Sequence, residues 1–211
     1  MSNSCSGVFD LKKIILASKS TDRREIFKRL KIPFEILITN IDEQKYKTSF
    51  INPIELVKEL AKAKALYAKE NQLKNKLDAV IIAADTIVEC DGDIIGKANN
   101  KREAFEILKK LEGKAHNLIT GIAITETNNP KIIVDSDTTV VEFLNLTSEE
   151  IEDYIKTNEW VGRAGAYSIR DKASFFINKI NGSTSNVIGL PMHKIYYIMR
   201  NEFGLNLFRT D

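Results

Sequence analysis

Asp85 is the residue of this sequence whose position most strongly indicates chemistry. It follows an apolar run at 79–84 that is long enough for a strand buried on both faces. Burying a carboxylate costs free energy, so we expect Asp85 to bind a cation at the mouth beyond the strand end, where open α/β sheets hold ligands. Asp42 and Glu43 follow a second predicted strand and offer oxygen ligands of the type that magnesium prefers. The plain alternatives are an Asp85 that caps a turn and an acidic pair that is merely solvated.

A hydroxyl-rich stretch near the N-terminus leads from a predicted strand at 14–16 into a helix. Ser18 and Ser20 precede that helix. Asp22 and Glu25 fit a capping box, although Thr21 or Ser20 could cap the helix equally well. The free backbone N–H groups and the positive dipole end of such a helix start favour an anion, most plausibly phosphate.

Basic residues surround this predicted anion site. Three lie within one turn of the helix start: Lys19, Arg23 and Arg24. The alternative interpretation is an ordinary capped helix with solvated basic side chains. In either case we expect the apolar face of the helix, residues 26, 27 and 30, to be buried.

Two lysines elsewhere extend the same chemistry. Lys97 follows a hairpin and a glycine and could reach a phosphate, whereas Lys64 lies on a lysine-rich helix, where such residues are usually exposed. His116 and His193 have no clustered partner and are expected to be structural. The sequence contains neither a dinucleotide fingerprint nor a Walker loop. An anion site, basic side chains and metal-binding carboxylates together suggest phosphate-ester chemistry on a nucleotide-like substrate.

Composition limits the class of protein. The chain has 211 residues and a net charge of +2, which argues against a nucleic-acid-binding surface. Its apolar runs are too short to span a membrane, and its first thirteen residues do not resemble a secretory signal. Cys5 and Cys90 are the only cysteines, so we expect free thiols in a reducing, cytoplasmic environment.

The elements that must position these residues alternate along the chain as in one α/β unit. Besides the first strand and helix, we expect a polar loop at 40–44 and an irregular glycine-rich segment at 160–170. The other predicted strands are 34–39, 79–84 with a resumption at 87–90, 93–95, 118–125, 132–144 and 173–180. The other predicted helices cover 53–70, 100–113, 147–155 and 191–204, opened by Pro53, Asn100, a capping box at Thr147 and Pro191.

Several ordered motifs resemble those of the Maf-type nucleoside triphosphate pyrophosphatases over about residues 14–190. The motifs are Leu16-Ala17-Ser18-x-Ser20 with Arg23 and Glu25, Ile41-Asp42-Glu43, Lys64-Ala65, Ala84-Asp85-Thr86-Ile87-Val88, Gly96-Lys97, Gly113-x-x-His116, Thr120-Gly121, Ala164-Gly165-Ala166-Tyr167 and Gly182-Ser183 with Val187-x-Gly189-Leu190-Pro191. One such motif would be weak, but this many in order are specific.

The resemblance implies an α/β fold with a long curved mixed sheet flanked by helices, and two lobes with a central cleft. It divides the chain into an N-terminal extension at 1–13 and a single Maf-like domain at 14–211. It also implies hydrolysis of a nucleoside triphosphate to the monophosphate and pyrophosphate with a divalent cation, Mg²⁺ or Mn²⁺. A homodimer and a service in nucleotide-pool sanitation are implied as well, without nucleic acid or membrane as partner.

The resemblance also implies residue roles. Asp85 falls on the general-base position and, with Glu43, on the metal-binding carboxylates. The phosphate-contacting positions are occupied by Ser18, Ser20, Arg23, Lys64 and Lys97. The positions that vary with the base are occupied by Asp22, Thr86 and Arg170.

This chain departs from the family pattern at several positions. Asp22 stands where an arginine is common, and Arg170 where the dTTP- and UTP-hydrolysing branch has glutamine, so the base preference is open and the two side chains could pair. Ala63 and Ala98 replace a usual glutamate and proline. The rival function is a nucleotide-binding regulator of cell division or septum formation without turnover.

Overall fold

The computed structural model describes residues 12–209, so Cys5 and residues 1–11 of the predicted extension lie outside the described part. Its strands are β1 (Lys13–Ala17), β2 (Glu35–Ile36), β3 (Ala79–Cys90), β4 (Asp93–Ile95), β5 (Ala115–Glu126), β6 (Ile132–Phe143) and β7 (Ile177–Asn181). Its helices are α1 (Thr21–Arg29), α2 (Glu43–Ser49), α3 (Pro53–Lys74), α4 (Lys101–Leu111), α5 (Ser148–Lys156), α6 (Thr184–Val187) and α7 (Met192–Phe203), with a 3₁₀ turn η1 (Lys172–Phe175).

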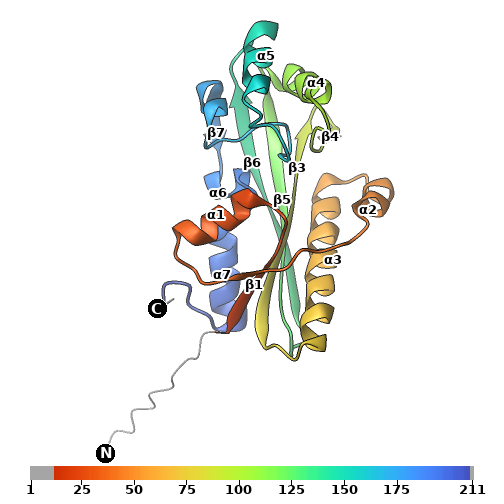
Figure 1. Ribbon diagram of the computed structural model, residues 1–211, viewed down its shortest axis with the longest axis vertical. Helices are drawn as coiled ribbons and strands as arrows, with labels where there is room; N and C mark the ends of the chain where they lie inside the picture. The colour runs from red at the N-terminus through yellow and green to blue at the C-terminus, as the bar shows by residue number, and fades with distance from the viewer. Residues whose placement is uncertain (1–11, 210–211) are drawn as a thin grey trace, which may run out of the picture.

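The seven strands form one mixed sheet in the order β2-β1-β3-β5-β6-β7, with β4 added to β3. β1 runs parallel to β2 and β3, whereas the remaining pairs are antiparallel. Helices flank this sheet (Figure 1). The predicted α/β fold with a mixed sheet is therefore confirmed.

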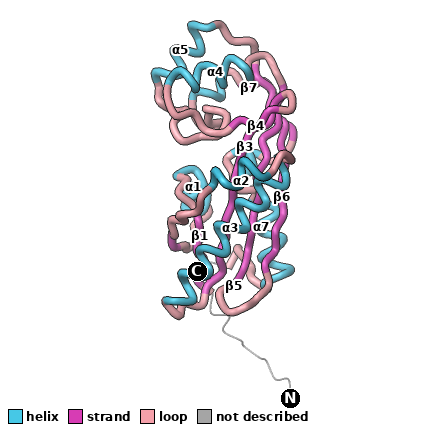
Figure 2. The backbone as a smooth tube through the Cα atoms, turned by 90° about the vertical axis from the view of Figure 1, so that its right-hand side faces the viewer, coloured by secondary structure: helices cyan, strands magenta, loops and turns pink. Residues whose placement is uncertain are grey.

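Three long strands connect two lobes. β3, β5 and β6 have 12 residues each, which corresponds to roughly 40 Å. One end of the sheet carries α1, α3 and α7, and we call it the α3 lobe; the other carries α4, α5 and β7, and we call it the α5 lobe (Figures 1 and 2). Among residues 12–209, none of the helices combines the length and apolar character needed to cross a membrane.

The continuous apolar run of β3 is explained by helices on both faces of the sheet. Even-numbered residues such as Ile82 pack in one cluster with Phe27 of α1 and Ile195 of α7. Odd-numbered residues such as Ile81 pack in another with Ala65 of α3. Because side chains alternate across a strand, a strand covered on both faces shows no polar alternation.

Several predicted helix ends are confirmed. Asn100 caps α4, Thr147 and Glu150 form the capping box of α5, and Gly204 ends α7 in the left-handed conformation. Ser20, one of the predicted alternatives, caps α1 through its side-chain oxygen.

Three predictions are wrong for segments at or beyond the edge of the sheet. The predicted strand 34–39 shrinks to Glu35–Ile36, because β1 ends at Ala17 and a strand beside it has no further partner. The predicted loop at 40–44 instead opens α2, since the Asp42 side chain accepts hydrogen bonds from the N–H groups of Gln44 and Lys45. Leu30, expected in the core, is 51% exposed because it lies beyond the last helical residue of α1.

Two further ranges need correction. The expected strand at 173–180 begins as the η1 turn and becomes β7 only at Ile177. The sequence also predicted that the strand ends at residue 84 and resumes at residue 87. Instead, β3 pairs with β5 without interruption from Val80 to Glu89. Asp85 therefore lies inside a strand and not at its end.

Gly121 allows α3 to pack close to the sheet beside Asp85, its partner in the β3–β5 ladder. A Cβ at Gly121 would lie 2.2 Å from the carbonyl oxygen of Val57, two turns before Lys64. We expect Gly121→Ala to displace α3, to cost about 1–3 kcal/mol of folding free energy, and to lower the melting temperature by roughly 2–12 °C.

Gly96→Ala is the matched control for this measurement by thermal unfolding. A Cβ at Gly96 meets no atom within 4 Å, and the residue does not have a positive φ angle. Equal melting temperatures for the two variants would contradict the close approach of α3.

His116 is a structural residue of the α5 lobe, as expected. Its imidazole is 2% exposed, bonds the Tyr167 hydroxyl at 3.0 Å and packs edge-on against Phe143. Burial lowers the pKa of His116 from 6.5 to about 4. The folded protein thus keeps the ring neutral over a range in which the unfolded chain protonates it.

This difference predicts that His116 makes folding stability fall as the pH is lowered from about 6.5 to about 4. The loss is on the order of 3 kcal/mol for two and a half pKa units. In a comparison of melting temperatures between pH 7 and pH 5, His116→Gln should weaken the pH dependence. The same slope in the wild type and in His116→Gln would exclude a buried neutral His116.

Candidate active site

A cleft between the two lobes brings together the residues to which the family resemblance assigned a role, whereas Asp42 and Arg24 are not among the residues that line it. The residues with an assigned role are Ser18, Ser20, Asp22, Arg23, Glu43, Lys64, Asp85, Thr86, Lys97 and Arg170. The cleft is also lined by residues that the sequence had not singled out, among them Arg163, Ile169 and Ile188. The fold therefore assembles the predicted residues in one place, while their chemical roles remain predictions.

The cleft lies where one edge of β3 has no neighbouring strand. β1 pairs with β3 as far as Ala83, and β4 begins to pair at Val88. Residues 84–87 therefore lack a strand partner on this side within the described part of the chain. Asp85 becomes accessible through this interruption of the sheet edge.

Lys64 joins the two candidate metal ligands. Its Nζ lies 2.5 Å from Oδ1 of Asp85 and 2.7 Å from Oε1 of Glu43. The Lys64 side chain is only 10% exposed, which corrects the expectation that a lysine of this helix is solvated. Burial alone would raise the pKa of Glu43, but the charge and hydrogen bond of Lys64 bring that pKa below its ordinary value.

The same two carboxylates fit a divalent cation in the chemistry of their donors. They converge on one cationic atom, and carboxylate oxygens are the ligands that Mg²⁺ and Mn²⁺ prefer. Residues 12–209 contain no group of three or more His, Cys, Asp or Glu side chains arranged for a metal ion. A cation bound here would therefore need oxygen atoms from a substrate or from water to complete its shell.

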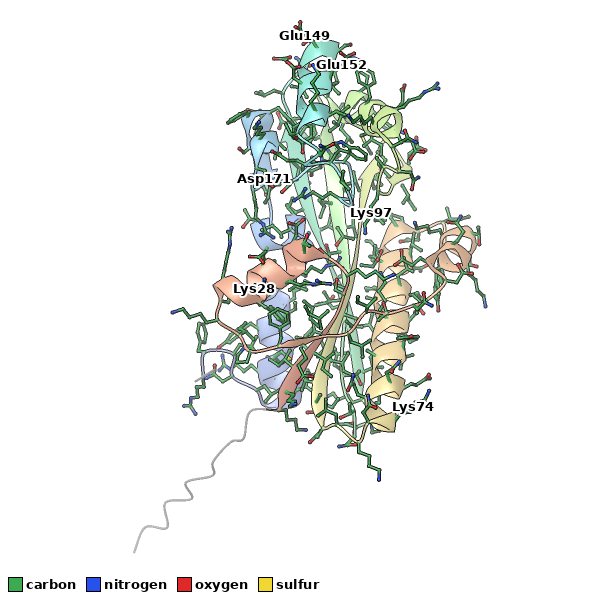
Figure 3. The ribbon with its side chains drawn as sticks, in the orientation of Figure 1. Lys28, Lys74, Lys97, Glu149, Glu152 and Asp171 are labelled. Carbon is green, nitrogen blue, oxygen red and sulfur yellow. The ribbon has the colours of Figure 1, made fainter. Side chains whose placement is uncertain are left out.

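The opposite wall of the cleft carries positive charge and free donors. The first turn of α1 opens with Ser20 as cap, and N–H groups in a first turn have no partner within their helix. Lys97 approaches from the hairpin, where it forms a backbone bridge with Ala164; Figure 3 shows it between the lobes. Lys97 is exposed, but partial desolvation in the cleft, followed by the positive charge of Arg23, lowers its pKa.

Arg23 differs from the solvated side chain that the alternative interpretation expected. It is 8% exposed, and its guanidinium donates to Gly189 O at 2.6 Å, Ala84 O at 2.9 Å and Thr86 Oγ1 at 2.8 Å. A fourth bond reaches Ser18 Oγ at 3.2 Å. Four of the five N–H donors of Arg23 are thus used by protein atoms.

Asp22 is held between two arginines from the other lobe. Nε of Arg163 donates to Oδ2 of Asp22 at 3.1 Å, and Nη2 of Arg170 donates to the Asp22 carbonyl at 2.6 Å. The Asp22 and Arg170 side chains are 23% and 14% exposed, so they are not a surface pair. The sequence missed Arg163, whose only signal was a cationic residue within the glycine-rich segment.

The Thr86 hydroxyl is already engaged by protein atoms. It accepts a hydrogen bond from Arg23 and lies 3.0 Å from the hydroxyl of Thr120, which in turn donates to Asn186 O at 3.2 Å. Cys90, the cysteine within the described residues, is a buried free thiol, as expected.

Comparison with known proteins gives one family. The model of the Maf-like protein family matches residues 13–202. A "dTTP/UTP pyrophosphatase" from Alkaliphilus oremlandii is 45% identical over 199 residues, which cover 93% of this chain and 100% of that protein. Proteins of the same name from Caldanaerobacter subterraneus and Clostridium novyi are 43% and 40% identical over 92% of this chain and 90% and 100% of their own length. This chain therefore belongs to the Maf-like protein family.

Proposed function

We propose that this protein hydrolyses nucleoside triphosphates to nucleoside monophosphates and pyrophosphate. The observation that carries the proposal is the convergence of the Asp85 and Glu43 carboxylates on one cationic position, facing the start of α1 and Lys97 across a cleft. Carboxylates for a metal on one wall and donors for phosphate on the other suit phosphoryl transfer. The names of the relatives support the same reaction.

Asp85 and Glu43 would hold a divalent cation, Mg²⁺ or Mn²⁺. When bound, that cation would neutralise charge on the phosphate oxygens of the substrate. In the structure, the ammonium group of Lys64 compensates the negative charge of the two carboxylates. If the two carboxylates held a cation, the Lys64 ammonium would be free to donate to a phosphate oxygen.

Asp85 is the proposed general base. It would take a proton from the attacking water as the phosphoanhydride bond breaks and pyrophosphate leaves. Ser18 and Ser20 shape the turn before α1, so that its first N–H groups face the phosphates. Lys97 adds a cationic donor from the α5 lobe.

Asp22, Arg170 and Thr86 are proposed to contact the base, together with the newly identified Arg163. An arginine donates to carbonyl oxygens of a base, and a carboxylate accepts from its N–H groups. The relatives are named for dTTP and UTP. In this chain the ion pairs around Asp22 set which donors remain for the base.

We further propose that the protein acts in the cytoplasm as a homodimer that removes unwanted nucleotides from the pool. The rival, a nucleotide-binding regulator without turnover, predicts nucleotide binding but no release of pyrophosphate. A screen of pyrophosphate release over common and modified nucleoside triphosphates, with Mg²⁺ and with Mn²⁺, separates the two functions.

Asp85→Asn tests the general base. The change keeps the side-chain shape but removes its charge and basicity, so turnover at saturating substrate and metal should fall by at least about a hundredfold. Asp153→Asn, at an exposed acid of α5, is the matched control and should keep normal turnover. Wild-type turnover in Asp85→Asn would remove Asp85 from the mechanism.

The double replacement Asp22→Arg with Arg170→Gln tests the base contacts. It should raise activity on UTP and dTTP relative to GTP and ATP by roughly ten- to a hundredfold, because an unpaired buried polar group costs about 1–3 kcal/mol. Because Arg163 would then lie next to an arginine at position 22, the double replacement should also be tested in combination with Arg163→Gln. An unchanged rank order of the four nucleotides in folded, active variants would refute this assignment.

A further inference from the structure

One edge of β3 has no neighbouring strand at residues 84–87 within the described part of the chain, and this affects how rigidly the candidate active site is held. A strand in a sheet interior is held by ladder hydrogen bonds on both sides, whereas residues 84–87 are paired only with β5. Asp85 lies within this segment. Its position would therefore vary with any local movement of β3, unless another group takes the place of the missing strand.

Arg23 contacts this segment through one backbone oxygen and one side-chain oxygen. Its Nη1 donates to the carbonyl oxygen of Ala84 at 2.9 Å, and its Nη2 donates to the hydroxyl of Thr86 at 2.8 Å. These two residues directly flank Asp85. On its other side the guanidinium donates through Nε to the Gly189 carbonyl at 2.6 Å.

Gly189 is shaped for this contact. Its φ angle is +97°, and a Cβ there would lie 3.0 Å from Oγ1 of Thr86 and 3.2 Å from Nε of Arg23. The chain thus approaches the guanidinium where a side chain would crowd it. Arg23 consequently bridges α1, β3 and the turn that follows α6.

We propose that Arg23 is a positioning residue that holds Asp85 in place by substituting for the missing strand, and that it is not a ligand of the substrate phosphates. The inference rests on the proposed function in taking Asp85 as the reacting carboxylate. It reassigns Arg23 from the phosphate-contacting role that the family resemblance implied. Four of its five donors are already bound to protein, which leaves one N–H for any other partner.

We call Arg23 and its bonds to Ala84, Thr86 and Gly189 the clamp. A chain of hydroxyl groups extends the clamp across the sheet. The Thr86 hydroxyl accepts from Arg23 and lies 3.0 Å from the Thr120 hydroxyl, which in turn lies 3.2 Å from the carbonyl oxygen of Asn186. Two hydroxyl groups thus connect the guanidinium to β5 and to the carbonyl of Asn186.

The geometry requires arginine and not merely a positive charge. A guanidinium is a rigid planar fork that reaches several acceptors at once, whereas a lysine ammonium is a compact point charge. Arg23→Lys retains the charge near the phosphates but cannot bond Gly189, Ala84 and Thr86 together. This variant therefore separates positioning from phosphate binding.

The first measurement is the steady-state kinetics of Arg23→Lys with a nucleoside triphosphate that the wild type hydrolyses. Positioning predicts that kcat falls by about tenfold or more, while KM stays within about threefold, because an interaction made only in the transition state is lost. A rise in KM across all triphosphates with an unchanged kcat would show that Arg23 binds phosphate and would overturn the proposal.

Thr120→Val supplies a second variant that does not touch the cleft. Thr120 is fully buried, and valine matches its shape while removing the hydroxyl. We expect a smaller fall in kcat with unchanged KM, because the end of the hydrogen-bond chain is lost but Arg23 stays in place. Wild-type kcat in a folded Thr120→Val would contradict the extension of the clamp to β5.

Hydrogen exchange tests the clamp without any turnover. In Arg23→Lys the β3 amides at 84–88 should exchange about tenfold faster than in the wild type, because the ladder to β5 opens more often. Arg24→Lys is the matched control, since within residues 12–209 the Arg24 side chain donates to the carbonyls of Ser18 and Lys19 and not to β3. Unchanged exchange in Arg23→Lys would overturn the proposal even if the protein hydrolysed no nucleotide, so this outcome is distinct from failure of the proposed function.

Discussion

A carboxylate placed in the middle of an apolar strand is the constraint on which the rest of this structure depends. Asp85 is partly buried there, and the Lys64 ammonium 2.5 Å away offsets the cost of withdrawing its charge from water. Lys64 reaches it because α3 packs directly on the sheet, and α3 packs so closely because Gly121 has no side chain. The position of the proposed general base and the packing of α3 thus depend on each other.

The cleft follows from an interruption in the hydrogen bonding of the sheet. Because β1 stops at Ala83 and β4 starts at Val88, the edge of β3 is open between the two lobes. Successive strand residues face opposite sides, so Asp85 meets Lys64 of α3 while Thr86 meets Arg23 of α1. A ligand at the open edge can therefore contact groups from both faces of the sheet, which a continuous sheet would keep apart.

The ion pairs around Asp22 mark the end of the cleft that we propose for the base. Asp22 belongs to α1 of the α3 lobe, whereas Arg163 and Arg170 belong to the loop of the α5 lobe. Their side chains are one-quarter exposed or less, so water screens them less than surface charges. The same residues that would contact the base thus also hold the two lobes together across the cleft.

The sequence by itself determined the elements whose signals are local. The buried strand at 79–84, the caps at Asn100 and Thr147 and the stop at Gly204 depend on neighbouring residues, and the ordered motifs identified the residues of the cleft. Only the tertiary structure decided where β3 loses its neighbour, that Lys64 is buried against Asp85, and that Arg23 bonds protein atoms instead of water. These features depend on contacts between residues that are distant in the chain, such as Arg23 with Gly189 and Asp22 with Arg163. A local pattern carries no information about such partners, because the same helix start or lysine-rich face is compatible with solvent or with burial.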